Sequence, residues 1–590
     1  MRNPKILVIV IIVFALSAWW FFDLASYLQL ETLQQGIGGL REWCGNNPLL
    51  AGLIFFAGYI VVTALSLPGS AVMTLAGGAL FGFWYAMLLV SFASSIGATL
   101  AFLVSRLLLR DWVQQRFSRH LGALNRGFAK DGSFYLFSLR LVPIFPFFMI
   151  NLLMGLLPIR PWPFYWVSQL GMLPATVVFV NAGTQLGQLE SLYGIISLPL
   201  LGSFALLALF PFIARWLLGA LKPRLILAAY PKPKQFDNNL IVIGAGSGGL
   251  VASLIAATVK AKVTLIERHQ MGGDCLNTGC VPSKALIRSA RIAQYARRAE
   301  EFGLAPMSVE VNFPKVMQRV QNVIKTIEPH DSVERFTELG VNCVQGDAKI
   351  LSPWEVEVNG QTLTAKNIVI ATGARPRVPD IPGLAALDYL TSDTVWDIRD
   401  LPERLLVVGA GPIGCELAQS FARLGSKVTL VTRADRLLPR EDPEVSERVH
   451  AEFRRQHVKV HANYNPLFFG AAEDEQTCVF STPRGQRKLS FDRVLLAVGR
   501  SANVEGLGLE NLGIAVGPEG TVEVDAFLRT AIPTIFACGD VAGPYMFTHM
   551  ASHQAWYAAV NALFGRFRTF KVDYSVVPWA TFTDPEVARV

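Results

Sequence analysis

The chain shows two hydrophobic patterns, and the change between them comes near residue 221. Before that point apolar residues run almost without interruption, in stretches covering residues 6–22, 49–66, 71–105, 134–157, 162–186 and 192–221. The longer stretches suffice to cross a bilayer as helices, which takes about 20 residues. After residue 221, short apolar runs of strand length alternate with helical segments. The fold class predicted is multidomain: an all-α membrane domain over residues 1–221, then α/β domains.

Charge follows the same division. Residues 1–221 hold 18 charged side chains, against 80 in the remaining 369 residues. This break excludes a wholly soluble or a disordered protein. Of the net charge of +8, +6 lies in the first part, so basic loops beside a membrane explain it and no nucleic-acid partner is expected. Seven scattered cysteines argue against a secreted disulfide framework.

Basic residues predict the orientation in the membrane. Stretch 6–22 lacks a small-residue cleavage site and is interpreted as an uncleaved helix. Positive charge gathers in residues 106–130 and after residue 221, which the positive-inside rule places in the cytoplasm with the N-terminus. Six crossings would put 106–130 outside, so 49–82 and 134–157 are predicted to be re-entrant hairpins. The breaks are expected at Leu67–Ser70 and around Pro143 and Pro146. We therefore expect a multi-pass inner-membrane protein with four spans.

One charged side chain, Arg140, stands just before the second predicted break. Two interpretations remain open for it: an interfacial side chain that snorkels to the headgroups, or a functional group inside the membrane.

The membrane half carries motifs of a known family. They are Ala76–Gly82, Gly97, Lys130–Gly132 and Arg140–Pro143, followed by Pro146. With these motifs, residues 45–186 resemble the DedA/SNARE-associated (VTT-type) membrane proteins. The resemblance implies two re-entrant hairpins and either lipid handling or proton-coupled transport. The acidic residue that many members carry in the first hairpin is absent here.

A dinucleotide-binding pattern follows a basic, proline-containing linker over residues 222–236. A strand over 240–243 leads into a glycine turn with Gly244, Gly246 and Gly249, then a helix, then a strand ended by Glu267. In this order the glycines permit a tight turn, close approach of a pyrophosphate to the helix N-terminus, and helix packing on the strand. Glu267 is predicted to accept a hydrogen bond from a ribose hydroxyl.

A second copy of the pattern begins at residue 404. Its glycines are Gly409, Gly411 and Gly414, and its second strand ends on Arg433 rather than on an acid. An arginine at that place suits the 2′-phosphate of NADPH, with Arg436 or Arg440 in support, so NADPH is preferred over NADH.

A cysteine pair lies between the two copies. Cys275 and Cys280 are five positions apart at the start of a predicted helix, where the helix N-terminus lowers the pKa of a thiol. They are expected to open and close a disulfide. Two thiols without neighbouring cysteine or histidine make a poor zinc site, so no metal site is predicted. Asp274 is expected to raise the pKa of Cys275.

Residues 238–590 resemble the class I pyridine nucleotide–disulfide oxidoreductases, such as dihydrolipoyl dehydrogenase and mercuric reductase. The motifs are the cysteine segment Met271–Lys284 with Ala371–Gly373, Ala497–Arg500 and Ala537–Asp540. The resemblance implies FAD in the first dinucleotide site, Cys280 as the flavin-facing thiolate and Cys275 as the exchanging thiol. It also implies Lys284 near the flavin, paired with Glu416. The further residues implied at the two cofactors are Gly273, Ala348, Thr372, Gly373, Gly539, Asp540 and Ala551 for FAD, and Gly499 for NADPH.

The resemblance also implies the domain boundaries of the second part of the chain. It implies an FAD-binding domain in two parts, 237–388 and 516–580, around an NAD(P)-binding domain over 389–515. Residues 581–590 would begin a truncated dimerisation domain, so a homodimer is expected only with the missing part. His549 and His553 are expected to be structural.

Two functions follow as hypotheses. The first is a membrane-tethered enzyme that passes electrons from NADPH through FAD to the cysteine pair and on to a disulfide, a metal ion or a quinone. The alternative is a lipid-handling or transport protein with a redox-sensing flavoprotein domain.

Overall fold

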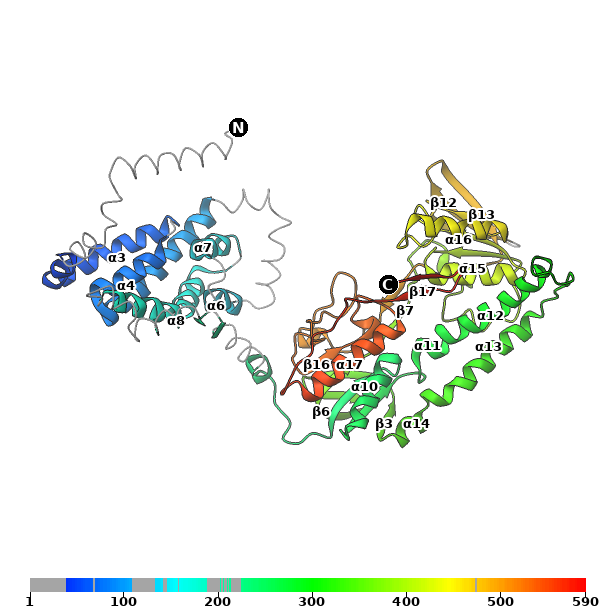
Figure 1. Cartoon of the computed structure of the whole chain (residues 1–590), viewed down its shortest axis with the longest axis horizontal. Helices are drawn as coiled ribbons and strands as arrows, with labels where there is room; N and C mark the ends of the chain where they lie inside the picture. Colours follow the sequence, from blue (N-terminus) through cyan, green and yellow to red (C-terminus); the bar gives the residue numbers. More distant parts are fainter. Residues whose placement is uncertain are drawn as a thin grey trace. The chain divides into compact units, whose positions relative to one another are not determined.

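The computed structural model describes residues 39–66, 69–108, 133–141, 146–157, 159–187, single positions between 202 and 213, 224–472 and 475–590. The chain forms two compact units, Met1–Lys222 and Pro223–Val590, each of which is described by itself (Figure 1).

The first unit is helical. Its described helices are α3 (Pro48–Ala64), α4 (Ser70–Leu108), α6 (Ser133–Leu141), α7 (Phe147–Gly155) and α8 (Pro161–Gly187). Helix α4 has a break at Gly82, whose φ of 72° and ψ of 177° are not helical. Helices therefore flank both predicted hairpin breaks, while the break residues 67–68 and 142–145, stretch 6–22 and most of 192–221 lie outside the described residues.

Two of the described helices are long and apolar enough to cross a membrane, Ser70–Leu107 and Pro161–Gly187. A third span is obtained if the bent pair Gly39–Asn46 and Pro48–Ala64 counts as one. Small residues let α4 and α8 approach closely, because a Cβ on Gly183 would lie 2.1 Å from the carbonyl oxygen of Leu75.

The second unit is α/β, with a first sheet built around parallel strands. The strand order is β3 (Val341–Gln345), β2 (Val263–Glu267), β1 (Asn238–Ile243), β6 (Gln361–Ile370), β5 (Glu355–Val358) and β4 (Ala348–Ser352), with β16 (Ile535–Ala537) paired to β6. Strands β4 and β5 join antiparallel. Helices α10 (Ser247–Thr258) and α17 (Thr548–Phe564) pack together beside this sheet (Figure 1).

A second parallel sheet has the order β10 (Lys459–His461), β9 (Lys427–Val431), β8 (Arg404–Val408) and β14 (Arg493–Leu496). It carries helices α15 (Pro412–Leu424) and α16 (Pro443–Arg455). The antiparallel strands β11 (Asn465–Ala472), β12 (Glu475–Thr482) and β13 (Gly485–Phe491) form a separate three-stranded sheet. Two short ribbons complete the unit, β7 (Ala374–Pro376) with β15 (Arg500–Ala502), and β17 (Trp579–Thr581) with β18 (Val587–Arg589). The predicted fold class, a helical membrane-type region followed by α/β domains, is confirmed.

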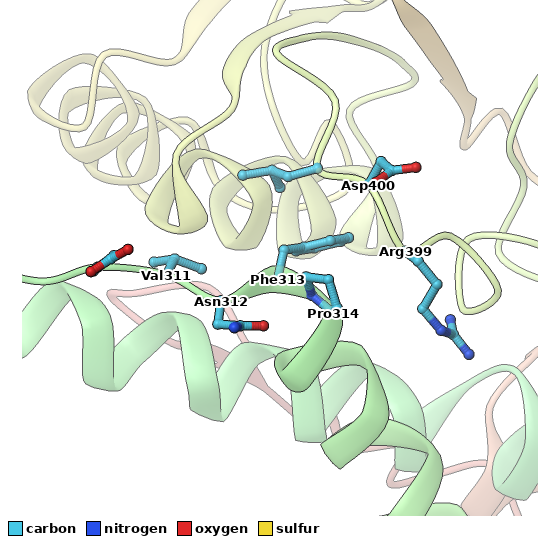
Figure 2. A pocket seen from close by; sticks show the side chains of 8 residues that line it. Val311, Asn312, Phe313, Pro314, Arg399 and Asp400 are labelled. Carbon is cyan, nitrogen blue, oxygen red and sulfur yellow. The ribbon is translucent and has the colours of Figure 1, made fainter.

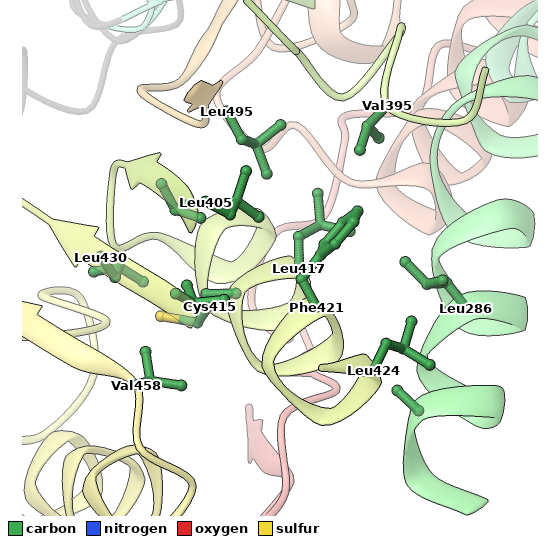
Figure 3. Packing of buried hydrophobic residues seen from close by; sticks show 14 of the residues in the cluster. Leu286, Val395, Leu405, Cys415, Leu417, Phe421, Leu424, Leu430, Val458 and Leu495 are labelled. Atoms are coloured by element: carbon green, nitrogen blue, oxygen red, sulfur yellow. The ribbon is translucent and has the colours of Figure 1, made fainter. Parts of the chain in front are cut away.

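One hydrophobic core ties the second sheet to helices that lie earlier in the chain. Helix α12 (Cys280–Arg297) and helix α13 (Phe313–Ile327) pack against α15, and Figure 3 shows Leu286 of α12 facing Phe421 and Leu424 of α15. Burial of these side chains supplies the main stabilisation at this junction. It fixes the start of α12, where the cysteine pair lies, against α15.

Part of the predicted linker, residues 222–236, has regular structure. Residues 224–228 are helical, and Ile226, Leu227 and Tyr230 pack against the core of the first sheet. The apolar side chains of this segment bury area on the sheet, so part of 222–236 belongs to the second unit.

An open hollow of about 550 Å³ lies between the start of α13 and the loop at Arg399–Leu401 (Figure 2). Phe313 and Pro314 line one side of it. The residues that line it are not among the predicted site residues.

Candidate functional site

The first glycine turn has a geometry that only glycine permits. Gly244 has a φ of +99°, and a Cβ there would lie 2.4 Å from the carbonyl oxygen of Ala371. A Cβ on Gly249 would lie 1.7 Å from the carbonyl oxygen of Gly244, so the helix α10 could not close on β1. Gly246 caps α10, and a Cβ on Gly273 would lie 2.6 Å from the Cα of Gly246. The turn leaves the N-terminal N–H groups of α10 open to an anionic group, as a dinucleotide requires.

Glu267 lies at the carboxyl end of β2, beside this turn. Its Oε2 accepts a hydrogen bond from the backbone N–H of Ala245 at 2.7 Å, and its Oε1 accepts one from His269 at 2.9 Å. The carboxylate is therefore held in place at the edge where open α/β sheets bind nucleotides. These residues fit the dinucleotide that the sequence predicts.

The second glycine turn repeats the first. Gly409 has a φ of +115°, and a Cβ there would lie 2.2 Å from the carbonyl oxygen of Ala497. A Cβ on Gly414 would lie 1.9 Å from the carbonyl oxygen of Gly409. Gly411 caps α15, and Gly499 has a φ of +114°. The same two close approaches in both turns indicate two dinucleotide sites.

Arg433 lies just after β9, with an exposed side chain. Arg436 forms an ion pair with Asp435 at 3.3 Å, so its charge is shared with a carboxylate.

The two cysteines lie on consecutive helices. Cys275 lies in α11 (Gly273–Asn277), Cys280 begins α12, and both are free thiols in this structure. A hydrogen bond from Cys275 lowers the pKa of Cys280 from its ordinary value of 9.0 to about 6, with help from Thr548 and Lys284. The same hydrogen bond, together with burial, raises the pKa of Cys275. One proton therefore leaves the pair easily and the other stays, with the thiolate on Cys280.

Thr548 is a contact of the pair that sequence reasoning missed. Its hydroxyl lies 3.3 Å from the sulfur of Cys280, although the two residues are 268 positions apart. Thr548 is the first residue of α17, and nothing in its local sequence signals this contact.

The prediction that Asp274 raises the pKa of Cys275 names the wrong cause for that shift. The carboxylate of Asp274 forms an ion pair with Arg500, and the pKa of Cys275 is raised first by Cys280 and by burial. The guanidinium of Arg500 also lies 3.4 Å from Asp540. Burial raises the pKa of Asp540, which lies in the 3₁₀ turn Gly539–Val541 after β16. The arginine thus neutralises two carboxylates of the site.

Lys284 and Glu416 are brought together across the α12–α15 junction. The Nζ of Lys284 donates to Oε2 of Glu416 at 3.0 Å, and the backbone N–H of Phe582 donates to Oε1 at 2.9 Å. The side chain of Glu416 is 7% exposed, and Nζ lies 4.5 Å from the centre of the Phe582 ring. Phe582 is the second contact that sequence reasoning did not identify.

The other predicted FAD residues lie around the first sheet. Thr372 donates to the backbone of Asn503 at 2.7 Å, and Gly373 follows it with a φ of +66°. A Cβ on Gly539 would lie 3.2 Å from the Cβ of Ala551 on α17, so these two approach closely. Ala348 begins β4 and pairs with Val358.

His549 and His553 both have structural contacts. The ring of His549 stacks on Phe547, and Nε2 of His553 lies 2.8 Å from the carbonyl oxygen of Asp573.

The interfacial interpretation of Arg140 in the first unit is wrong. The side chain is buried at 4% exposure, its Nε donates to Ser168 at 3.1 Å, and its Nη2 donates to Asn151 at 2.6 Å. The rings of Phe147 and Phe164 lie 5.2 and 5.4 Å from the guanidinium carbon. A buried guanidinium costs free energy, which favours the functional alternative.

Comparison with protein-family models identifies both parts of the chain. The model described as pyridine nucleotide-disulphide oxidoreductase matches residues 238–555, and the VTT domain model matches residues 67–185. The chain therefore belongs to the pyridine nucleotide-disulphide oxidoreductase family and carries a VTT domain before it. Both predicted resemblances are confirmed, and the family implies FAD together with a pyridine nucleotide.

Similar proteins agree with this assignment. The chain is 34% identical over 357 residues to a mercuric reductase of Staphylococcus aureus, covering 60% of this chain and 64% of the relative. It is 36% identical over 362 residues to a dihydrolipoyl dehydrogenase of Chlamydia pneumoniae, covering 60% and 76%. Among solved structures, the HOCl-induced flavoprotein disulfide reductase RclA from Escherichia coli superposes with a TM-score of 0.53 at 28% identity, covering 59% and 76%.

Proposed function

We propose that this chain is a membrane-tethered oxidoreductase that carries electrons from NADPH by way of FAD to the Cys275–Cys280 pair, and from there to an acceptor. The acceptor is a disulfide, a metal ion or a quinone. The observation that carries the proposal is the geometry of the pair: Cys280 begins α12, the hydroxyl of Thr548 lies 3.3 Å from its sulfur, and a hydrogen bond from Cys275 lowers its pKa.

Bound FAD would supply the two-electron chemistry between the nicotinamide and the cysteine pair. The chain's own residues prepare that chemistry in three ways. Thr548 donates to the Cys280 thiolate. Lys284, anchored by Glu416, places a positive charge on the same side and favours negative charge that builds during reduction. Cys275 keeps its proton until an acceptor arrives.

With a disulfide as the acceptor, the exchange reaction begins at Cys275. Cys275 loses its proton, its sulfur attacks the acceptor disulfide, and one acceptor thiolate leaves. The Cys280 thiolate then attacks the sulfur of Cys275, which closes the Cys275–Cys280 disulfide and releases the second acceptor thiolate. Two electrons pass to the acceptor, and its thiolates take up protons from solvent.

The test is an acceptor screen on the purified full-length protein. NADPH oxidation is followed with lipoamide, glutathione disulfide, Hg²⁺ and a short-chain quinone, each with the native protein and with Cys275→Ser. We expect at least one acceptor to require Cys275. Equal rates in both proteins for every acceptor would contradict the proposal.

The preference for NADPH depends on Arg433. Its exposed guanidinium follows β9, where an acid would favour the unphosphorylated ribose of NADH. We expect a lower KM for NADPH than for NADH, and Arg433→Glu should reverse that order. A native preference for NADH would show that this loop has been misinterpreted.

The cytoplasmic position of the second unit depends on the basic loops of the sequence. Engineered cysteines at positions 25–45 and 187–191 should be labelled from outside intact cells, and those at 115–125 should not. Outside labelling at 115–125 would remove the argument for two re-entrant hairpins.

The buried Arg140 favours a second candidate function for the VTT domain, the handling of a lipid. Lipid movement by the full chain in vesicles, measured without NADPH and compared with Arg140→Met, tests this function separately.

A further inference from the structure

The amino edge of the first sheet brings together two segments that are distant in sequence. Strand β1 begins at this edge with Asn238. The end of α17 lies beside it, because the side chain of Asn367 donates to the carbonyl oxygen of Ala562 at 2.7 Å and Asn367 pairs in register with Leu240. The residues that follow, 564–571, are called the α17 loop here. The glycine turns of the dinucleotide sites lie at the opposite, carboxyl edge.

The α17 loop presents aromatic side chains to solvent. Phe567 is 89% exposed and Phe564 is 39% exposed. The loop is nevertheless held firmly, since Asn561 is buried and its side chain both donates to and accepts from the backbone of Phe570, at 2.8 and 2.7 Å. The ring of Trp556 packs against Phe570 and is itself 42% exposed. Several exposed aromatic side chains gathered at one fixed loop, rather than a single one, indicate an interaction surface.

The charge around this loop is mainly positive. The α17 loop itself carries Arg566, Arg568 and Lys571, and the turn between α10 and β2 carries Lys260 and Lys262, whose carbonyl oxygen accepts from the backbone of Asn239 at the start of β1. Asp237, just before β1, is an acid at this edge, and its carboxylate accepts hydrogen bonds from Thr364. Exposed aromatic rings between basic side chains are suited to the interface of a bilayer that contains anionic lipids.

We propose that the α17 loop is an interfacial anchor that docks the second unit onto an anionic lipid surface. The inference depends on the membrane tethering proposed above. The α17 loop lies at the amino edge of the first sheet, so its surface can meet the headgroups while the dinucleotide sites at the carboxyl edge stay open to the aqueous phase. Phe567 enters the interface, and Arg566, Arg568 and Lys571 contact lipid phosphates.

The test uses the full-length protein in vesicles of phosphatidylcholine with one quarter phosphatidylglycerol. A photoreactive benzoylphenylalanine replaces Phe567, and in a matched control it replaces Phe302, which is 59% exposed on the 3₁₀ turn Ala299–Phe302. We expect the lipid crosslinking yield at position 567 to exceed that at 302 about fivefold, the factor that one basic residue near an anionic surface contributes. Pure phosphatidylcholine or high salt should remove most of this excess.

The two proposals fail in different ways. If alkaline carbonate extracts the protein from the vesicles, the membrane tethering is wrong. If the protein stays in the membrane but positions 567 and 302 crosslink equally, the docking inference is wrong. A variant with Arg566→Glu, Arg568→Glu and Lys571→Glu should lose the excess while retaining its FAD content, because all three side chains lie outside the cofactor site. Undiminished crosslinking in that variant would also overturn the inference.

Discussion

The ionisation of Cys280 depends above all on the hydrogen bond from Cys275. That bond is the largest of the causes that bring the pKa of Cys280 from 9.0 to about 6. Near pH 7, a pKa of about 6 leaves about 90% of Cys280 as thiolate, whereas a pKa of about 9 leaves about 1%. The thiolate is present above about pH 6 and is lost as the pH falls through that value.

Two variants of Cys275 separate the hydrogen bond from the redox chemistry. Neither Cys275→Ser nor Cys275→Ala can form the disulfide, but only serine keeps a donor beside Cys280. We expect Cys275→Ser to keep a pKa for Cys280 near 6, and Cys275→Ala to raise it toward 9. Thr548→Val, which removes the weaker donor, should produce a smaller rise.

Two measurements report the ionisation. In the FAD-loaded protein, a thiolate against the flavin produces a long-wavelength absorption band, which should be present without reductant in Cys275→Ser and should need alkaline pH in Cys275→Ala. The rate of alkylation of Cys280 by iodoacetamide, followed by peptide mass spectrometry over a range of pH, gives the same pKa independently. If both variants titrate at the same pH, or if Cys280 titrates near 9 in Cys275→Ser, the argument from the hydrogen bond is refuted.

Further predictions concern the glycine turn and the ion pair. Gly249→Ala should abolish FAD binding and lower stability, because its Cβ would lie 1.7 Å from a carbonyl oxygen. The neighbouring Gly248→Ala, whose Cβ would meet nothing closer than 3.4 Å, should bind FAD normally. Measurements of FAD content and of thermal unfolding distinguish the two variants. Glu416→Gln should lower the pKa of Cys280 and Lys284→Met should raise it, since the carboxylate raises and the ammonium lowers that pKa. Shifts in the same direction in both variants, measured by alkylation, would contradict this electrostatic account.

Local patterns in the sequence determined much of this protein. Both glycine turns could be located because their geometry depends on neighbouring residues, and Gly244 with Gly249 lie within one turn and one helix. The membrane half could be recognised from its apolar runs, and the cysteine pair from its spacing at the start of a helix. The family resemblance added the pairing of Lys284 with Glu416, which spacing alone could not supply.

Only the tertiary structure decided which distant groups meet at the site. Thr548 reaches Cys280 because α17 packs beside α10 on the first sheet, and Arg500 neutralises Asp274 because β15 pairs with β7. Arg140 is buried because α6, α7 and α8 close around it. The residues next to it in the sequence are equally compatible with a position at the membrane–water interface. Such contacts depend on chain segments tens to hundreds of residues apart, and local sequence carries little information about where those segments pack.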